Sequence, residues 1–186
     1  MASSSPPPAD PERLFEDDSL ALCVLDSLIA EDLVSTDLVI PALAPTEDDD
    51  PDDESESWRD RIDEGQLRIT NELLALLAAN RDALPKLTVL ESMVMSIAED
   101  YEPDVRSLAG LEQCTALESV ALASTYRKLD LRPLTKLPAL TEVHLLGCDR
   151  LKDLEPLFEI PTLTRVTGDL PEPVARELLR RGVALE

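Results

Sequence analysis

The chain is 186 residues long, which suits a single domain with appended tails, and its formal net charge is −22. Residues 1–65 hold 20 acidic and 3 basic residues and therefore carry −17 of that charge. Such a negative field repels nucleic acid and anionic lipid, and no apolar run approaches the roughly 18 residues of a membrane span. We therefore expect neither nucleic acid nor a membrane as a partner.

The N-terminus and the cysteines favour a cytoplasmic protein. Residues 1–8 lack the basic start and the apolar centre of a signal peptide. The three cysteines, Cys23, Cys114 and Cys148, are scattered and odd in number, which fits a reduced interior better than a disulfide framework. No two of them have zinc-ligand spacing, so we expect no metal or other cofactor.

The first third of the chain predicts a tail and two helices. Residues 1–12, rich in serine and proline, are expected to form a disordered tail. From about Leu14 to Val34 apolar residues recur at steps of three and four, which predicts an amphipathic helix with Ser19 as its N-cap. A second helix is predicted from about Gln66 to Asn80.

Between these two helices lies a strongly acidic segment. Eight of the ten residues 47–56 are acidic, and their mutual repulsion predicts a disordered loop near residues 41–57. The spaced ligands and central glycine of an EF-hand are missing, so a calcium loop is the less favoured interpretation. Together these segments form a helical N-terminal region over residues 13–83, and residues 84–186 form a second part.

Four segments beyond residue 83 superimpose on one another. Each has the pattern Leu-x-x-Val-x-Leu or a variant of it, and each follows apolar residues at three-residue steps. The segments are Leu90–Met95, Leu117–Leu122, Leu140–Leu145 and Leu163–Gly168, with starts 27, 23 and 23 residues apart. In the first copy Leu87 is an alternative start, which moves that register by three residues.

Three-residue steps do not fit one face of an α-helix, because each step advances about 300° and turns the apolar stripe by about 60°. Prolines also interrupt these segments: Pro133, Pro138, Pro156 and Pro161. A 3₁₀-like winding followed by a short, half-buried strand fits the pattern. Units of this kind bury their leucines only by stacking, so the sequence predicts a short α/β solenoid with parallel strands over residues 84–186.

Two stretches carry a family resemblance. Asp130–Leu145 and Asp153–Val166 resemble the short leucine-rich repeats of internalin-like bacterial proteins, and the resemblance extends over residues 84–168. It implies a leucine-rich-repeat solenoid. In that family the third position after the last strand leucine is usually Asn or Cys, part of a ladder that bonds to loop carbonyls. Cys148 matches this position and Ala98 departs from it.

A solenoid needs a cover at each end of its core. The helical N-terminal region is expected to cover the first repeat. Residues 15–38 and 67–90 are similar to an uncharacterised bacterial domain found beside such repeats. This similarity implies no activity. Pro173–Gly182 predicts a C-terminal capping helix, because proline suits the first turn, arginines the last, and glycine the residue beyond. Val183–Leu185 predicts a final strand.

The sequence offers little for catalysis. His144 is the only histidine and lies on a predicted strand, opposite the leucines, where a partly exposed surface residue is the favoured interpretation. The five glycines form no phosphate-binding loop, and carboxylate pairs are too common in this chain to mark an active site. We expect no enzyme, with unfamiliar carboxylate chemistry as the alternative.

The strand residues that alternate with the buried leucines form the candidate protein-binding surface. They are Ser119, Ala121, Ala123, Glu142, His144, Leu146, Arg165 and Thr167, with Ser92, Val94 and Ser96 beside them if the first copy starts at Leu90. Small and apolar residues with charge at one end suit protein recognition.

The leading hypothesis is therefore a non-catalytic module that binds a protein. An immunity- or antitoxin-type inhibitor of a basic partner is its most specific form, since a negative field steers a basic protein toward it. A structural scaffold whose acidic loop only maintains solubility is the other non-enzymatic interpretation. The oligomeric state stays open.

Overall fold

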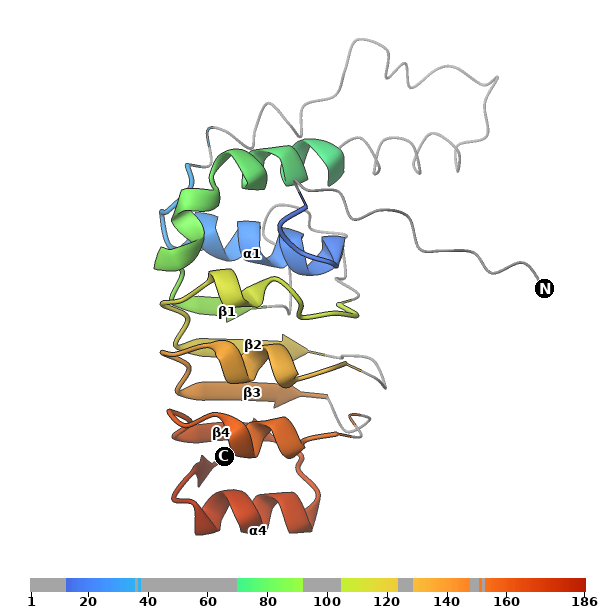
Figure 1. The fold of residues 1–186 in the computed structure, drawn as a ribbon, viewed down its shortest axis with the longest axis vertical. Helices are drawn as coiled ribbons and strands as arrows, with labels where there is room; N and C mark the ends of the chain where they lie inside the picture. Colours follow the sequence, from blue (N-terminus) through green and yellow to red (C-terminus); the bar gives the residue numbers. More distant parts are fainter. Residues whose placement is uncertain are drawn as a thin grey trace, which may run out of the picture.

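The computed structural model describes residues 13–35, 37, 70–91, 105–123, 129–147, 151 and 153–186. The expected disordered tail over residues 1–12, the expected acidic loop near 41–57, and Cys148 lie outside these residues. The described chain forms an α/β fold built on one parallel sheet (Figure 1).

The sheet has five strands that follow one another in chain order, and every neighbouring pair is parallel. The strands are β1 (Val89–Glu91), β2 (Ser119–Ala123), β3 (Glu142–Leu146), β4 (Arg165–Gly168) and β5 (Ala184–Leu185). Val120 pairs with Val143, and Val143 pairs with Val166, so the register advances by 23 residues from β2 to β3 and from β3 to β4, as the sequence repeat predicts.

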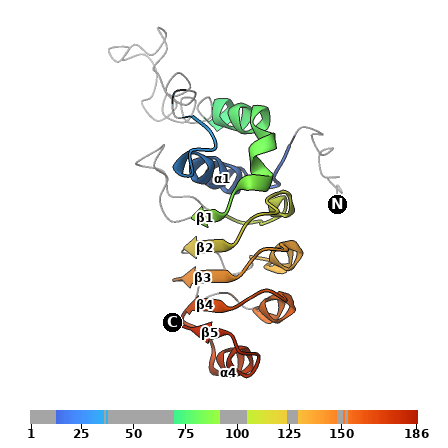
Figure 2. The same ribbon diagram turned by 90° about the vertical axis from the view of Figure 1, so that its left-hand side faces the viewer.

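A 3₁₀ helix precedes each of the first four strands, where the three-residue steps predict one. These helices are η2 (Arg81–Lys86), η3 (Leu111–Gln113), η4 (Arg132–Lys136) and η5 (Glu155–Glu159). Proline occupies the first turn of both η4 and η5, where its missing N–H costs no hydrogen bond. The 3₁₀ helices lie on one side of the sheet, and the other side carries no described helix (Figure 2).

The pairing of β1 with β2 selects one of the two registers that the sequence allows for the first copy. Leu90 pairs with Val120, which places Leu87, and not Leu90, opposite Leu117 as the start of the first copy. Val89 and Glu91 therefore alternate with the buried Leu90 and pair with Ser119 and Ala121, whereas Ser92, Val94 and Ser96 lie outside the described residues. Leu87 and Leu117 are 30 residues apart, whereas the later copies start 23 residues apart. A search for a constant repeat length therefore does not find this register.

The first helix, α1 (Asp18–Ala30), lies within the range that the sequence predicts, but its cap differs. Asp17, rather than Ser19, is the N-cap, because its backbone is extended and its Oδ1 accepts the N–H of Leu20 at 2.9 Å. The same carboxylate accepts the N–H of Arg106 through Oδ2 at 2.9 Å. One side chain thus caps the start of the helix and joins it to the segment before η3. Residues 70–79 form the described part of the second expected helix.

The C-terminal elements confirm the expected helix and strand. Helix α4 (Glu172–Arg180) carries proline in its first turn and packs against β5. The carboxylate of Glu177 accepts hydrogen bonds from Arg180 and Arg181, both at 2.7 Å, and these bonds lower the pKa of Glu177 to about 2. Arg181 also donates to the carbonyl of Phe158 at 2.7 Å and stacks on its ring, which ties the end of α4 to η5.

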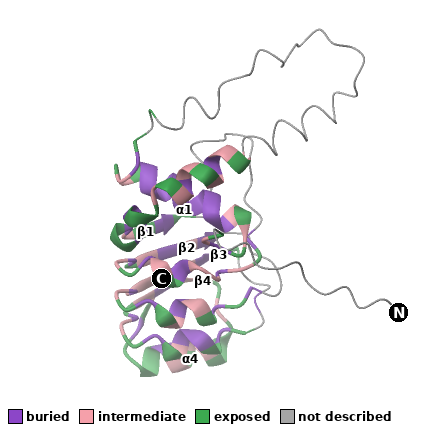
Figure 3. Cartoon of the chain, turned by 45° about the horizontal axis from the view of Figure 1, so that its top comes forward, coloured by how far each residue is buried: buried purple, intermediate pink, exposed green. Residues whose placement is uncertain are grey.

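One hydrophobic core runs through the whole described fold. It joins the apolar side of α1, Leu73 and Leu77 of the second helix, the leucines that precede each strand, and the inward side of the strands (Figure 3). Buried residues on both sides of residue 83 belong to this same cluster. The helical N-terminal region therefore shares its core with the sheet.

Candidate functional site

The candidate site is the open face, which we define as the partly exposed or exposed side chains of β1 to β4 on the side opposite the 3₁₀ helices. Strand geometry produces it, because successive side chains point to opposite sides of a sheet. Val120, Val143 and Val166 point into the core and are fully buried. The residues between them are partly exposed: Ser119, Ala121, Glu142, His144, Arg165 and Thr167.

The parallel register arranges these residues in rows across the strands. Ser119, Glu142 and Arg165 form one row, which Val89 extends on β1 and Ala184 extends on β5. Ala121, His144 and Thr167 form the next row, and Glu91 extends it on β1. Ala123 and Leu146 pair at the end of β2 and β3, but the structure describes only their backbone. The sheet thus brings the candidate residues of β2, β3 and β4 together in adjacent rows, whereas Ser92, Val94 and Ser96 lie outside the described residues.

A charged network occupies the β3 and β4 end of the open face. Glu142 lies at its centre, with Oε1 3.2 Å from Nη1 of Arg165 and Oε2 3.6 Å from Nε2 of His144. Arg165 also approaches Glu186, with Nε 3.6 Å from Oε1. A single guanidinium therefore lies between two carboxylates. Because these groups are partly exposed, their mutual attraction is screened by water and leaves them available to a partner.

The β1 and β2 end has a different character. Ser119 and Ala121 have small side chains, and they are flanked on β1 by Val89, which is 38% exposed, and by Glu91. Sequence reasoning missed Val89 and Glu91, since it placed Ser92 and Val94 in these rows. The alternative start at Leu87 was the signal that could have found them.

Thr167 is a partly exposed residue whose hydroxyl oxygen is buried. Its Oγ1 has no hydrogen-bond partner among the described residues. Buried polar atoms are nearly always hydrogen-bonded in folded proteins, so this oxygen marks an unused donor and acceptor at the edge of the charged network.

The arrangement on the open face favours ion pairing and hydrogen bonding over covalent chemistry. Serine, histidine and carboxylate side chains occur there, but Ser119 and His144 lie on different rows and different strands, and His144 contacts Glu142 through Nε2. In the part of the chain that the structure describes, no three histidine, cysteine or acidic side chains gather where they could hold a metal ion.

Cys23 and Cys114 are packing residues. Both are buried, Cys23 on α1 and Cys114 directly after η3. Burial raises the pKa of each thiol to about 12, helped by the nearby charge of Asp26 for Cys23 and of Glu112 for Cys114. A thiol in this state is a poor nucleophile.

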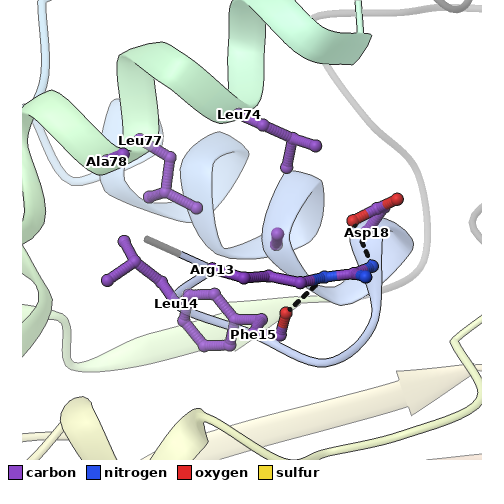
Figure 4. Close-up of a pocket in the computed structure, with 8 residues that line it drawn as sticks. Arg13, Leu14, Phe15, Asp18, Leu74, Leu77 and Ala78 are labelled. Atoms are coloured by element: carbon purple, nitrogen blue, oxygen red, sulfur yellow. Dashed lines mark hydrogen bonds and ion pairs between the residues drawn. The ribbon is translucent and has the colours of Figure 1, made fainter. Parts of the chain in front are cut away.

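A small pocket lies away from the open face, between α1 and the helix at residues 70–79 (Figure 4). Its cavity volume is about 60 Å³, small beside the several hundred Å³ of a typical ligand pocket. Leu14, Leu74 and Leu77 line it on the apolar side, and Arg13 closes it by donating to Asp18 at 2.7 Å and to the carbonyl of Phe15 at 3.0 Å. Only tertiary packing brings these residues together, and the sequence carried no signal for it.

Within the described residues no helix is both long and apolar enough to cross a membrane. A scan against protein-family models and searches of curated proteins and of solved structures found no match to this chain.

Proposed function

We propose that the chain is a short leucine-rich-repeat solenoid of bacterial type that binds a protein partner on its open face. The support for the fold is the 23-residue register between β2, β3 and β4, with a 3₁₀ helix before each strand and a leucine-lined core beneath. Repeats of this length that bury apolar residues only by stacking are typical of leucine-rich repeats. In this proposal α1 and α4 cover the two ends of the solenoid.

The observation that carries the binding function is the asymmetry of the sheet. One side is fully packed against leucines and 3₁₀ helices, and the other presents rows of small, charged and hydrogen-bonding side chains that no described helix covers. A flat array of adjacent strands supplies a continuous surface in which residues from several units contact one partner. Protein recognition makes use of such a surface, whereas a small ligand needs a deep cavity.

The charge of the chain favours a basic protein as the partner. A net charge of −22 attracts a basic protein and speeds its association. The carboxylates Glu91 and Glu142 on the open face, with Glu186 beside it, outnumber the single arginine of that face, Arg165. The proposed role is a cytoplasmic immunity- or antitoxin-type inhibitor that occupies a basic partner without catalysing a reaction.

An arginine placed on β2 tests this proposal. Ala121→Arg adds bulk and positive charge at the centre of the open face without burying a charge, because Ala121 is partly exposed. Ala79→Arg is the matched control, since it makes the same substitution at an exposed position of the second helix. The partner is first captured from the native host with the parent chain and identified, and its affinity for both variants is then measured by calorimetry.

Blocking a central contact of an interface commonly costs more than about 1 kcal/mol. We therefore expect Ala121→Arg to weaken binding at least about fivefold, while Ala79→Arg binds like the parent. Equal affinities for the two variants would show that the open face is not the binding surface, and the N-terminal helices would then become the next candidate.

The acidic segment 47–56 should act on the rate of association and not on the contact itself. Replacing its carboxylates by amides should slow association and weaken its salt dependence, with little change in dissociation. His144→Asp together with Leu146→Asp should instead speed dissociation. On- and off-rates measured for both variants against the captured partner separate the two roles.

A further inference from the structure

β1 is the first strand of the described sheet, so one of its two edges has no strand beside it among the described residues. In a parallel strand, successive residues direct their N–H groups to opposite edges. The carbonyl of Thr88, the residue directly before β1, faces β2, because it accepts the N–H of Ser119 at 3.1 Å. Val89 and Glu91 therefore direct their N–H groups to the outer edge, where a further strand would add.

Side chains at the C-terminal end of α1 accept both of these outward N–H groups: Ser27 lies in the helix, and Glu31 is its C-cap residue. The N–H of Val89 donates to Oε1 of Glu31 at 2.7 Å, and the N–H of Glu91 donates to Oγ of Ser27 at 3.3 Å. The Glu31 carboxylate also accepts the N–H of Thr88 at 3.1 Å and its hydroxyl at 2.8 Å. These partners are 57 to 64 residues apart in the sequence.

The spacing of the acceptors matches the spacing of the donors. Ser27 in α1 and Glu31 at its C-cap are four residues apart, which separates them by about 6 Å along the helix axis. Val89 and Glu91 are two residues apart on a strand, which separates their N–H groups by about 6.6 Å. The earlier helix residue meets the later strand residue, so α1 runs antiparallel to β1 and beside it (Figure 1).

The position of Ser27 on α1 fits this role. It is 6% exposed and lies among the apolar residues that the helix buries against the core. A buried hydroxyl is costly unless it is hydrogen-bonded, and its bond to Glu91 satisfies it. The helix thus carries a buried hydroxyl where the N–H of Glu91 reaches it.

We infer that α1 takes the place of a further strand, with Ser27 and Glu31 standing in for two of its carbonyl groups and closing the β1 edge. This role is separate from the proposed binding function, because it concerns the edge of the sheet and not the open face. An edge with free N–H groups is a template for pairing with another chain, and the two side chains remove that template. The two hydrogen bonds also fix the position of α1 along β1 more narrowly than apolar packing alone would.

Amide hydrogen exchange, resolved by residue with NMR, tests this inference in the full chain. In the parent, the amides of Val89 and Glu91 should be protected although they lie at the outer edge of the sheet. Glu31→Ala should speed exchange at Val89 about tenfold or more, with a smaller effect at Glu91. Ser27→Ala should show the converse pattern.

Two further variants complete the design. Glu31→Gln keeps one acceptor oxygen and should change the exchange of Val89 less than Glu31→Ala does. Glu118→Ala is the control, since it removes an exposed glutamate whose side chain bonds to none of the described residues. Its exchange rates at Val89 and Glu91 should equal those of the parent.

Three results would overturn the inference. The first is rapid exchange of Val89 and Glu91 in the parent, which needs no variant to fold. The second is an equal rise at these amides and at those of Val120 and Val143 in Glu31→Ala, because the glutamate would then only add global stability. The third is a Glu31→Ala variant whose exchange matches that of Glu118→Ala.

Discussion

Aspartate in place of Val120 tests the packing of the sheet most directly. Val120 lies in the middle of β2, is 0% exposed, and pairs with Leu90 on one side and Val143 on the other. Ala121, the next residue, points to the open face and is partly exposed. The pair Val120→Asp and Ala121→Asp therefore introduces the same charge on the two sides of one strand.

The expected magnitudes differ because only one of the carboxylates is buried. Val120→Asp loses the burial of a valine side chain, about 1.5–3 kcal/mol, and adds the cost of a buried charge without a partner, about 3 kcal/mol or more. The sum of about 4 kcal/mol or more is a large part of an ordinary stability of roughly 5–15 kcal/mol. Ala121→Asp faces water and should cost about 1 kcal/mol, partly through repulsion from Glu91 in the neighbouring strand.

Thermal unfolding followed by circular dichroism measures the difference. For a chain of this size 1 kcal/mol moves the midpoint by roughly 2–4 °C, so Val120→Asp should lower it by about 8 °C or more, and Ala121→Asp by at most about 4 °C. Val120→Thr keeps the shape of valine and buries one hydroxyl, at a cost of about 1–3 kcal/mol. This variant replaces Val120→Asp in the comparison if the aspartate variant does not fold. Equal midpoints for Val120→Thr and Ala121→Thr would refute the reasoning.

Three further predictions follow from backbone geometry and from the shifted pKa values. Gly110→Ala should destabilise the fold by at least about 1 kcal/mol more than Gly182→Ala in urea unfolding, since both have positive φ but only at Gly110 would a Cβ collide with a carbonyl oxygen, at 2.6 Å; equal losses would contradict this. The pKa values of Cys23 and Cys114, raised by burial from 9.0 to about 12, mean that only the unfolded chain loses these protons above pH 9, so stability should fall between pH 9 and 12. A variant with alanine at both cysteines should lose less stability over that interval, and an identical slope would contradict the assignment. The Glu177 carboxyl, whose pKa is lowered to about 2, should stay ionised as the pH falls through 4.5 in a ¹³C NMR titration, and a midpoint near 4.5 would show that its arginine contacts do not hold in solution.

The sequence alone predicts those parts of the structure that depend on a few consecutive residues. The alternation around Val120, Val143 and Val166 places one side of each strand in the core, because the side-chain period of a strand is two whatever surrounds it. The prolines and three-residue steps predict the 3₁₀ helices for the same reason, since winding and proline geometry are properties of a few consecutive residues. The candidate residues from Ser119 to Thr167 follow directly from these two patterns.

Tertiary structure decides the features that join distant parts of the chain. The pairing of Leu90 with Val120 places Val89 and Glu91 on the open face, and the irregular spacing of the first copy leaves two registers that only pairing with β2 separates. The bonds from Thr88, Val89 and Glu91 to α1 have no local signal, because a carboxylate 57 residues away becomes an acceptor only when packing brings the helix to the sheet edge. Periodicity in the sequence records which side of an element is apolar, whereas contacts between elements depend on how the apolar sides are packed together.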